Sequence, residues 1–256
     1  MEEIKSKENT RLSDLTFVFV ALGLLLMIFN QFQIASLDVN DSQSGSSGAP
    51  TGLSVAEASD VIPTGVPKIY GGELNLKYDD VNVNDARLAD ETIAVMSNFD
   101  KEIILQGNEL ERYIDILSEI SCEYCCGAQS VIVRRDEVAK MNSQIAAAIK
   151  SGQLTEEDAA QYRKTAGDSA CGCAHSYAMR GLTKYLLTQH GEEFTNEEVL
   201  EEVAKWKTLY FPGQMVAKAA VLKEKGIPFS YTNLGSNKYR DIEKGTSASS
   251  GMVGGC

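Results

Sequence analysis

The sequence predicts a mainly helical protein, with a single N-terminal transmembrane helix, a flexible tether and a helical extracytoplasmic domain containing minor β structure. Three observations predict this class. An uncharged apolar run extends from Leu15 to Leu37, Ser, Gly, Asp and Pro dominate the stretch up to Pro67, and helix-capping residues recur after Lys68 ahead of apolar positions spaced three and four apart. The expected segments are a cytoplasmic N-terminus over 1–14, a transmembrane anchor over 15–37, a flexible linker over 38–67, a helical Cys/His-site domain over 68–244 and a flexible tail over 245–256 that ends in Cys.

The apolar run over 15–37 is long enough to cross a hydrocarbon core of ~30 Å at ~1.5 Å per residue. A cleaved signal peptide is the alternative, but no A-x-A-like cleavage site follows the run. Lys5, Lys7 and Arg11 precede the run, whereas no Lys or Arg occurs over 12–67. The positive-inside rule therefore predicts a single-pass protein of the cell membrane, with its N-terminus in the cytoplasm and its C-terminal domain outside.

Helical periodicity dominates the domain over 68–244, and its helices carry recognisable start and stop signals. Asn108 with Glu111, and Thr195 with Glu198, match the capping-box pattern. Gly191 and Gly226 follow apolar patterns that they would terminate. The predicted helices cover 108–120, 136–150, 155–164, 174–190, the segment from Thr195 to the residue before Pro212, and 213–226. Short extended pieces are predicted over 102–105, 130–133 and 228–232.

Composition excludes several classes of function. With 24 basic and 36 acidic residues the formal charge is −12, which disfavours nucleic acid because phosphate binding depends on Lys and Arg. The chain has only two histidines, and it contains no G-x-S-x-G, H-E-x-x-H, Walker or Rossmann pattern. These observations favour a binding protein over an enzyme and assign no catalytic residue. The membrane is the expected partner, and a protein partner is left open.

The strongest chemical signal is a pair of cysteine clusters. Five of the six cysteines lie in SCEYCCGA and ACGCAH, and one of the two histidines completes the second cluster. If the clusters meet in space, C-x-x-C supplies two thiolates from one turn and C-x-C-x-H supplies up to three more ligands. The candidate metal ligands are Cys122, Cys125, Cys126, Cys171, Cys173 and His175. The first choice is Cys122, Cys125, Cys171 and Cys173, with Cys126 and His175 as substitutes or supporting groups.

Thiolates with one imidazole suit zinc, copper(I) or an iron–sulfur cluster. Zinc is the first choice for a closed site with four ligands. Copper(I) is the second, because C-C and C-x-C arrangements offer more sulfur than one tetrahedral ion uses. Cys256 ends a Gly- and Ser-rich arm and is a possible additional thiol, although a disordered tail is its simpler interpretation.

Two other interpretations of the cysteines remain open. Disulfides persist outside the cytoplasm, so the two clusters could be linked by disulfide bonds. The protein would then be a disulfide-stabilised surface module that binds a partner and has no catalytic or metal-binding role. Adjacent Cys125 and Cys126 cannot pair without strain, which counts against complete pairing. Alternatively, one cluster cycles between dithiol and disulfide as a membrane-anchored oxidoreductase.

The chain resembles an uncharacterised archaeal-type family of membrane-anchored, Cys-rich proteins over about Ile62 to Cys256. The strings that carry the resemblance are SCEYCCGA, ACGCAHSYAMRGL, WKTLYFPGQM and MVGGC. That resemblance implies no known activity. The C-G-C with its nearby histidine is also faintly similar to surface lipoproteins with a P-C-Y-C-G-C motif. Here Ala170 precedes Cys171 and no lipobox cysteine follows the apolar run, so lipid anchoring is not expected.

Overall fold

The computed structural model describes residues 59–246 and 251–255. The predicted N-terminus, the predicted span over 15–37 and most of the linker lie outside the described residues, as does Cys256. Among the residues that are described, no helix combines the length and the apolar character needed to cross a membrane.

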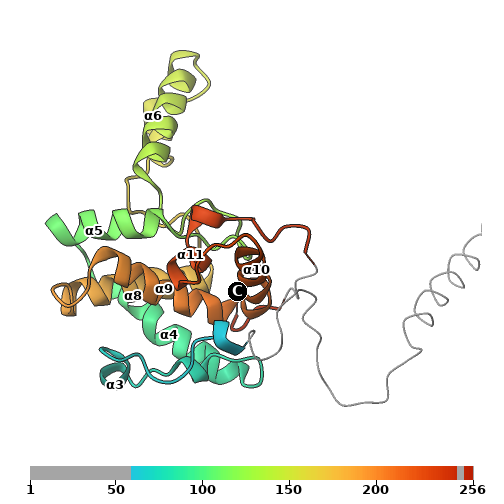
Figure 1. The fold of residues 1–256 in the computed structure, drawn as a ribbon. Helices are drawn as coiled ribbons and strands as arrows, with labels where there is room; N and C mark the ends of the chain where they lie inside the picture. The colour runs from blue at the N-terminus through green and yellow to red at the C-terminus, as the bar shows by residue number, and fades with distance from the viewer. Residues whose placement is uncertain (1–58, 247–250, 256) are drawn as a thin grey trace, which may run out of the picture. The chain divides into compact units, whose positions relative to one another are not determined.

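The described part of the chain is mainly helical, as predicted (Figure 1). Its α-helices are α3 (Gly71–Leu74), α4 (Ala86–Glu102), α5 (Gly107–Ser118), α6 (Arg135–Lys150), α7 (Glu156–Ala160), α8 (Ala174–Gln189), α9 (Asn196–Tyr210), α10 (Pro212–Glu224) and α11 (Tyr231–Gly235). The described residues also contain two 3-10 helices, η1 (Tyr78–Asp80) and η2 (Asn237–Tyr239).

Most predicted helices are found within a few residues of their expected bounds. The capping box at Thr195 and Glu198 opens α9 as predicted. The box predicted at Asn108 is wrong, because α5 already begins at Gly107, whose φ is +55°, and the N-cap is Gln106. Asn108 therefore lies inside the first turn, where its side chain cannot cap the helix.

The predicted extended pieces do not form strands in the described residues. The described residues contain two isolated antiparallel bridges, between Ile120 and Ser236 and between Ile132 and Ser169, and only Ile132 lies in a predicted piece. One predicted piece, over 228–232, runs instead into α11. The bridges nevertheless have a structural role, because both flank the segment that carries the first cysteine cluster.

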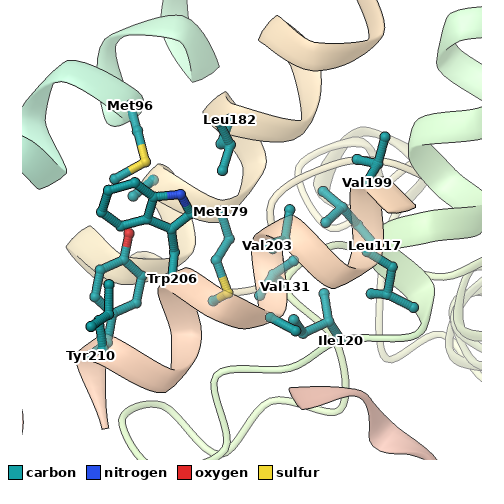
Figure 2. Close-up of a cluster of buried hydrophobic side chains, with 14 of the residues drawn as sticks. Met96, Leu117, Ile120, Val131, Met179, Leu182, Val199, Val203, Trp206 and Tyr210 are labelled. Atoms are coloured by element: carbon teal, nitrogen blue, oxygen red, sulfur yellow. The ribbon is translucent and has the colours of Figure 1, made fainter. Parts of the chain in front are cut away.

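The core lies where α4, α8 and α9 pack together, and α5 contacts both α8 and α9. Figure 2 shows Met96 from α4 and Met179 and Leu182 from α8 meeting Trp206 of α9. The Trp206 side chain is fully buried, and its Nε1 donates to the Tyr70 hydroxyl at 2.8 Å. Because the buried indole N–H keeps a hydrogen bond, its removal from water costs little free energy. The contact therefore stabilises the packing of α9 against the segment that contains Tyr70.

Two segments expected to be flexible contact this core. Val61, on the linker side of the predicted boundary at Lys68, is 5% exposed. Val253, in the predicted flexible tail, is 3% exposed, and its backbone N–H donates to the Tyr210 carbonyl at 2.9 Å. The C-terminal segment 251–255 is therefore packed against α9 and near the cysteine clusters.

The tightest approach between α4 and α8 depends on Gly181. A Cβ at this position would overlap the Met96 carbonyl oxygen and lie 2.9 Å from the Asp100 backbone nitrogen. Gly181→Ala is therefore expected to lower the free energy of unfolding by about 3 kcal/mol or more, because two helix backbones must separate. Denaturant unfolding followed by circular dichroism measures this change.

The matched control for Gly181 is Gly72→Ala, also in a helix. A Cβ added at Gly72 would meet no described atom within 4 Å, and the φ of this residue is not positive. We expect the unfolding free energy of the Gly72 variant to change by less than about 0.5 kcal/mol. Equal effects of the two substitutions would show that close backbone packing of α4 and α8 does not limit stability.

Candidate metal centre

The first cysteine cluster forms a tight loop after α5. The Cys122 carbonyl oxygen accepts hydrogen bonds from the backbone N–H groups of Cys125, Cys126 and Gly127, at 3.1 to 3.3 Å. Gly127 leaves this turn with a φ of +69°, a conformation that favours glycine. The turn brings the Cys122 and Cys125 side chains to one side, as a C-x-x-C metal loop requires.

The second cluster opens α8, as the sequence predicts. Cys173 is the N-cap residue, and its Sγ accepts from the Ser176 backbone N–H at 3.4 Å. The preceding loop is held by Arg180, which donates to the Cys171 carbonyl at 2.9 Å and pairs with Asp100 at 2.9 Å. Because Arg180 is 1% exposed, its guanidinium gives the loop a rigid internal support.

The two clusters meet in space. One potential ligand atom from each of Cys122, Cys125, Cys173 and His175 lies within 4.8 Å of all the others. Cys122 Sγ and Cys173 Sγ are 3.4 Å apart, and both Cys122 and His175 are 0% exposed. Three sulfurs and one imidazole thus converge at a site that could bind a metal ion. The site is buried at Cys122 and His175 and half-buried at Cys125 and Cys173.

The proton arrangement of the sulfurs is asymmetric. The hydrogen bond with Cys173 and burial both raise the pKa of the Cys122 thiol well above its ordinary value. The same hydrogen bond lowers the pKa of Cys173, and contacts with His175 and Ser176 act in the same direction. These directions favour Cys173 as the first of the two thiols to lose its proton, and the thiolate is the form that binds metal.

His175 is positioned by the C-terminal segment. Its Nε2 lies 2.8 Å from the Val253 carbonyl oxygen, which can only accept, so Nε2 carries the proton. Its ring also packs on Tyr210 at a centroid distance of 4.7 Å. This tautomer leaves Nδ1 with the lone pair that a metal requires, and a ligating histidine commonly donates its other N–H to a carbonyl in this way.

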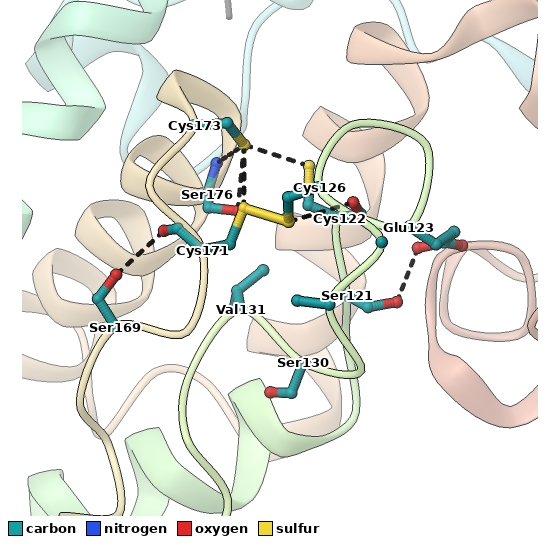
Figure 3. Close-up of a disulfide and its surroundings, with 12 residues drawn as sticks. Ser121, Cys122, Glu123, Cys126, Ser130, Val131, Ser169, Cys171, Cys173 and Ser176 are labelled. Carbon is teal, nitrogen blue, oxygen red and sulfur yellow. Dashed lines mark hydrogen bonds between the residues drawn. A yellow bond between two sulfur atoms is a disulfide. The ribbon is translucent and has the colours of Figure 1, made fainter. Parts of the chain in front are cut away.

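Cys126 and Cys171 do not join this group as separate ligands, because they form a disulfide (Figure 3). The group that could hold a metal ion therefore differs from the first choice made from the sequence. His175 takes the fourth position that was assigned to Cys171, and Cys126 is a disulfide partner. Spacing along the chain could not distinguish these roles, because both Cys171 and His175 are two residues from Cys173.

A buried ion pair supports the first loop, and it was not predicted from the sequence. Lys207 of α9 is 0% exposed, and its Nζ donates to Glu123 Oε2 at 2.6 Å and to the Gly235 carbonyl at 2.7 Å. Although burial alone raises the pKa of Glu123, Lys207 and Lys218 lower it below its ordinary value. The sequence signal was the spacing of Lys207 four residues after Val203, which puts it on the buried face of α9.

Fold and site together define a helical protein with a Cys₃His group beside a disulfide. Comparison of the chain with family models, curated proteins and solved structures finds no match. Function must therefore be argued from the site itself.

The packing of the C-terminal segment 251–255 beside His175 predicts that displacement of this segment lowers the affinity for metal. Val253→Asp should displace the segment, because it places a charge at a position that is 3% exposed. Loss of the acceptor for His175 Nε2 is expected to weaken metal binding by about 10- to 100-fold. Competition with a chromophoric chelator measures the affinity. Met252→Asp is the control, since Met252 is 43% exposed, and equal affinities of the two variants would refute the coupling.

Proposed function

We propose that this chain is a membrane-anchored extracytoplasmic protein that binds a soft metal ion, with zinc as the first choice, through Cys122, Cys125, Cys173 and His175. One observation carries the proposal: these ligand atoms lie within 4.8 Å of one another although they come from two distant segments. Such a site can join the loop after α5 to the start of α8. The biological role that we infer is binding, with no catalytic step assigned.

The donor set fits zinc in number and kind. Structural zinc sites are tetrahedral and closed, and Cys₃His is one of their usual compositions. With Zn–S bonds of about 2.3 Å, two sulfurs on one zinc ion lie about 3.8 Å apart. The 3.4 Å between Cys122 Sγ and Cys173 Sγ is close to that separation, so only small side-chain movements are needed. Copper(I) suits the same sulfurs, and an iron–sulfur cluster is the third choice.

The proposed location depends on the sequence of the N-terminal part. The uncharged run over 15–37 and the basic residues before it support a single-pass anchor with the domain outside. The Cys126–Cys171 disulfide is consistent with that side of the membrane, where disulfides persist.

Elemental analysis tests the metal proposal. The full-length chain is purified in detergent without chelator or added metal, and its free thiols are counted under denaturing conditions. The proposal expects about one zinc or copper ion per chain with one disulfide. A metal-free chain that also fails to take up either ion after reloading would refute it.

A second candidate function is thiol–disulfide exchange, favoured by the 3.5 Å between Cys173 Sγ and Cys171 Sγ. In that reaction the Cys173 thiolate attacks Cys171 Sγ, a Cys171–Cys173 disulfide forms and Cys126 leaves as the thiolate. The Cys171–Cys173 disulfide would then oxidise an external dithiol: the first thiolate of the dithiol attacks one of its sulfurs, and the second thiol releases both cysteines as thiols. A bound metal ion would occupy Cys173 and suppress the exchange, so turnover of a dithiol substrate that is unaffected by metal would favour this function instead.

A further inference from the structure

We propose that reduction of the Cys126–Cys171 disulfide creates a second metal site, which takes a soft monovalent ion such as copper(I) and shares Cys173 with the first. This inference rests on the proposed metal site at Cys122, Cys125, Cys173 and His175. It adds a second ion-binding position whose availability depends on the redox state of the chain.

The sulfur of Cys173 occupies the position that a bridging ligand needs. It lies 3.4 Å from Cys122 Sγ on one side and 3.5 Å from Cys171 Sγ, which belongs to the disulfide (Figure 3). Two sulfurs bound to one ion lie about 3.8 Å apart when each bond is about 2.3 Å. Cys173 is therefore at ligand distance from both groups of sulfurs, and thiolates bridge two ions readily when they are this close.

The remaining ligands come from the reduced disulfide. The Cα atoms of Cys126 and Cys171 are 6.4 Å apart, so both side chains can reach one ion without movement of the backbone. Cys126 is also held near the first site, because its Sγ lies 3.6 Å from the Cys122 carbonyl oxygen. With Cys173 these two thiolates supply three sulfurs. Three sulfurs complete a trigonal copper(I) site, whereas a structural zinc site requires four ligands.

The disulfide is open to reduction from one side. Cys126 is an exposed residue, whereas Cys171 is 4% exposed. A thiolate of an external dithiol attacks Cys126 Sγ, and the Cys171 thiolate leaves beside Cys173. The second thiol of the reductant then displaces Cys126, so the reductant becomes a disulfide and its two electrons remain on the two cysteines. Each of these thiols loses its proton to water when the ion binds.

Copper(I) stoichiometry tests the inference in the full-length chain carrying Cys256→Ser, which removes the tail thiol from the count. One sample keeps its disulfide, and the other is reduced with an excess of small dithiol that is then removed by anaerobic gel filtration. Both are loaded with copper(I) and separated from unbound ion. We expect about one ion per chain in the oxidised sample and about two in the reduced sample.

A Cys126→Ser, Cys171→Ser double variant is the matched control, and it should hold one ion after either treatment. Alkylation mapping of the wild-type chain gives a readout that does not depend on variant folding: after reduction, copper(I) should protect Cys126 and Cys171 from alkylation. One ion in both the oxidised and the reduced Cys256→Ser samples would overturn the second site while leaving the first intact. Two ions in the double variant would also overturn it. No ion in any sample would instead refute the proposed metal function.

Discussion

Cys173→Ser is expected to abolish stoichiometric metal binding, with an affinity loss of more than about 100-fold. Cys173 belongs to the Cys₃His group, and its Sγ lies 3.4 Å from Cys122 Sγ. Serine keeps the N-cap function, because its hydroxyl can accept from the Ser176 backbone N–H. The substitution therefore removes the sulfur while it preserves the start of α8.

Elemental analysis and chelator competition measure this loss, and Cys256→Ser is the control. Because a ligand that binds only the folded state stabilises it, chelation should lower the unfolding free energy of the wild type. That change is about 2.7 kcal/mol when metal had been present at 100 times its dissociation constant. Chelation should leave Cys173→Ser unchanged. A Cys173→Ser chain with wild-type metal content would remove this residue from the site.

Lys207→Met is expected to lower the free energy of unfolding by about 3–5 kcal/mol. The substitution leaves the buried Glu123 carboxylate without its closest cation, which lies at 2.6 Å with both side chains at 3% exposure or less. It also removes the donor to the Gly235 carbonyl. Glu123 is adjacent to Cys122, so we expect weaker metal binding as well as lower stability.

Lys218→Met provides a matched control of the same size and burial. Lys218 is 0% exposed, its Nζ has no hydrogen-bond partner among the described residues, and it lies 4.0 Å from Glu123 Oε1. Burial and the charge of Lys207 lower the pKa of Lys218 to about 8, so its charged form is poorly stabilised. Its replacement should change stability by less than about 1 kcal/mol. Denaturant unfolding compares the two variants, and equal losses would show that the Glu123–Lys207 hydrogen bond has no special role.

Helix positions were largely predictable because their signals are local. The apolar spacing and the capping box at Thr195 predict α9, and the same reasoning places α6, α8 and α10. Helix α4 was not predicted, although Asp85 caps it and Ala89, Ile93 and Met96 form its buried face. Its stability comes from packing on Gly181 of α8, which is a contact between distant segments.

The roles within the cysteine clusters were only partly predictable. The sequence alone identified all the residues that converge, because the clusters are dense and the chain has few other candidates. Its first choice for the fourth ligand was Cys171, with His175 as a substitute or supporting group. The structure instead joins Cys171 to Cys126 and brings His175 into the candidate group, where the Val253 carbonyl orients its ring.

By itself, then, the sequence determined the helical class of the domain and the set of sulfur and nitrogen atoms available to a metal, since both follow from residue type and short-range spacing. The tertiary structure decided which sulfurs pair in a disulfide and which converge as candidate ligands, and it placed Lys207 and the Val253 carbonyl behind the site. Disulfide bonds and metal coordination require atoms to meet within a few ångströms. Such distances between segments far apart in the chain depend on how the helices pack, which no local pattern records.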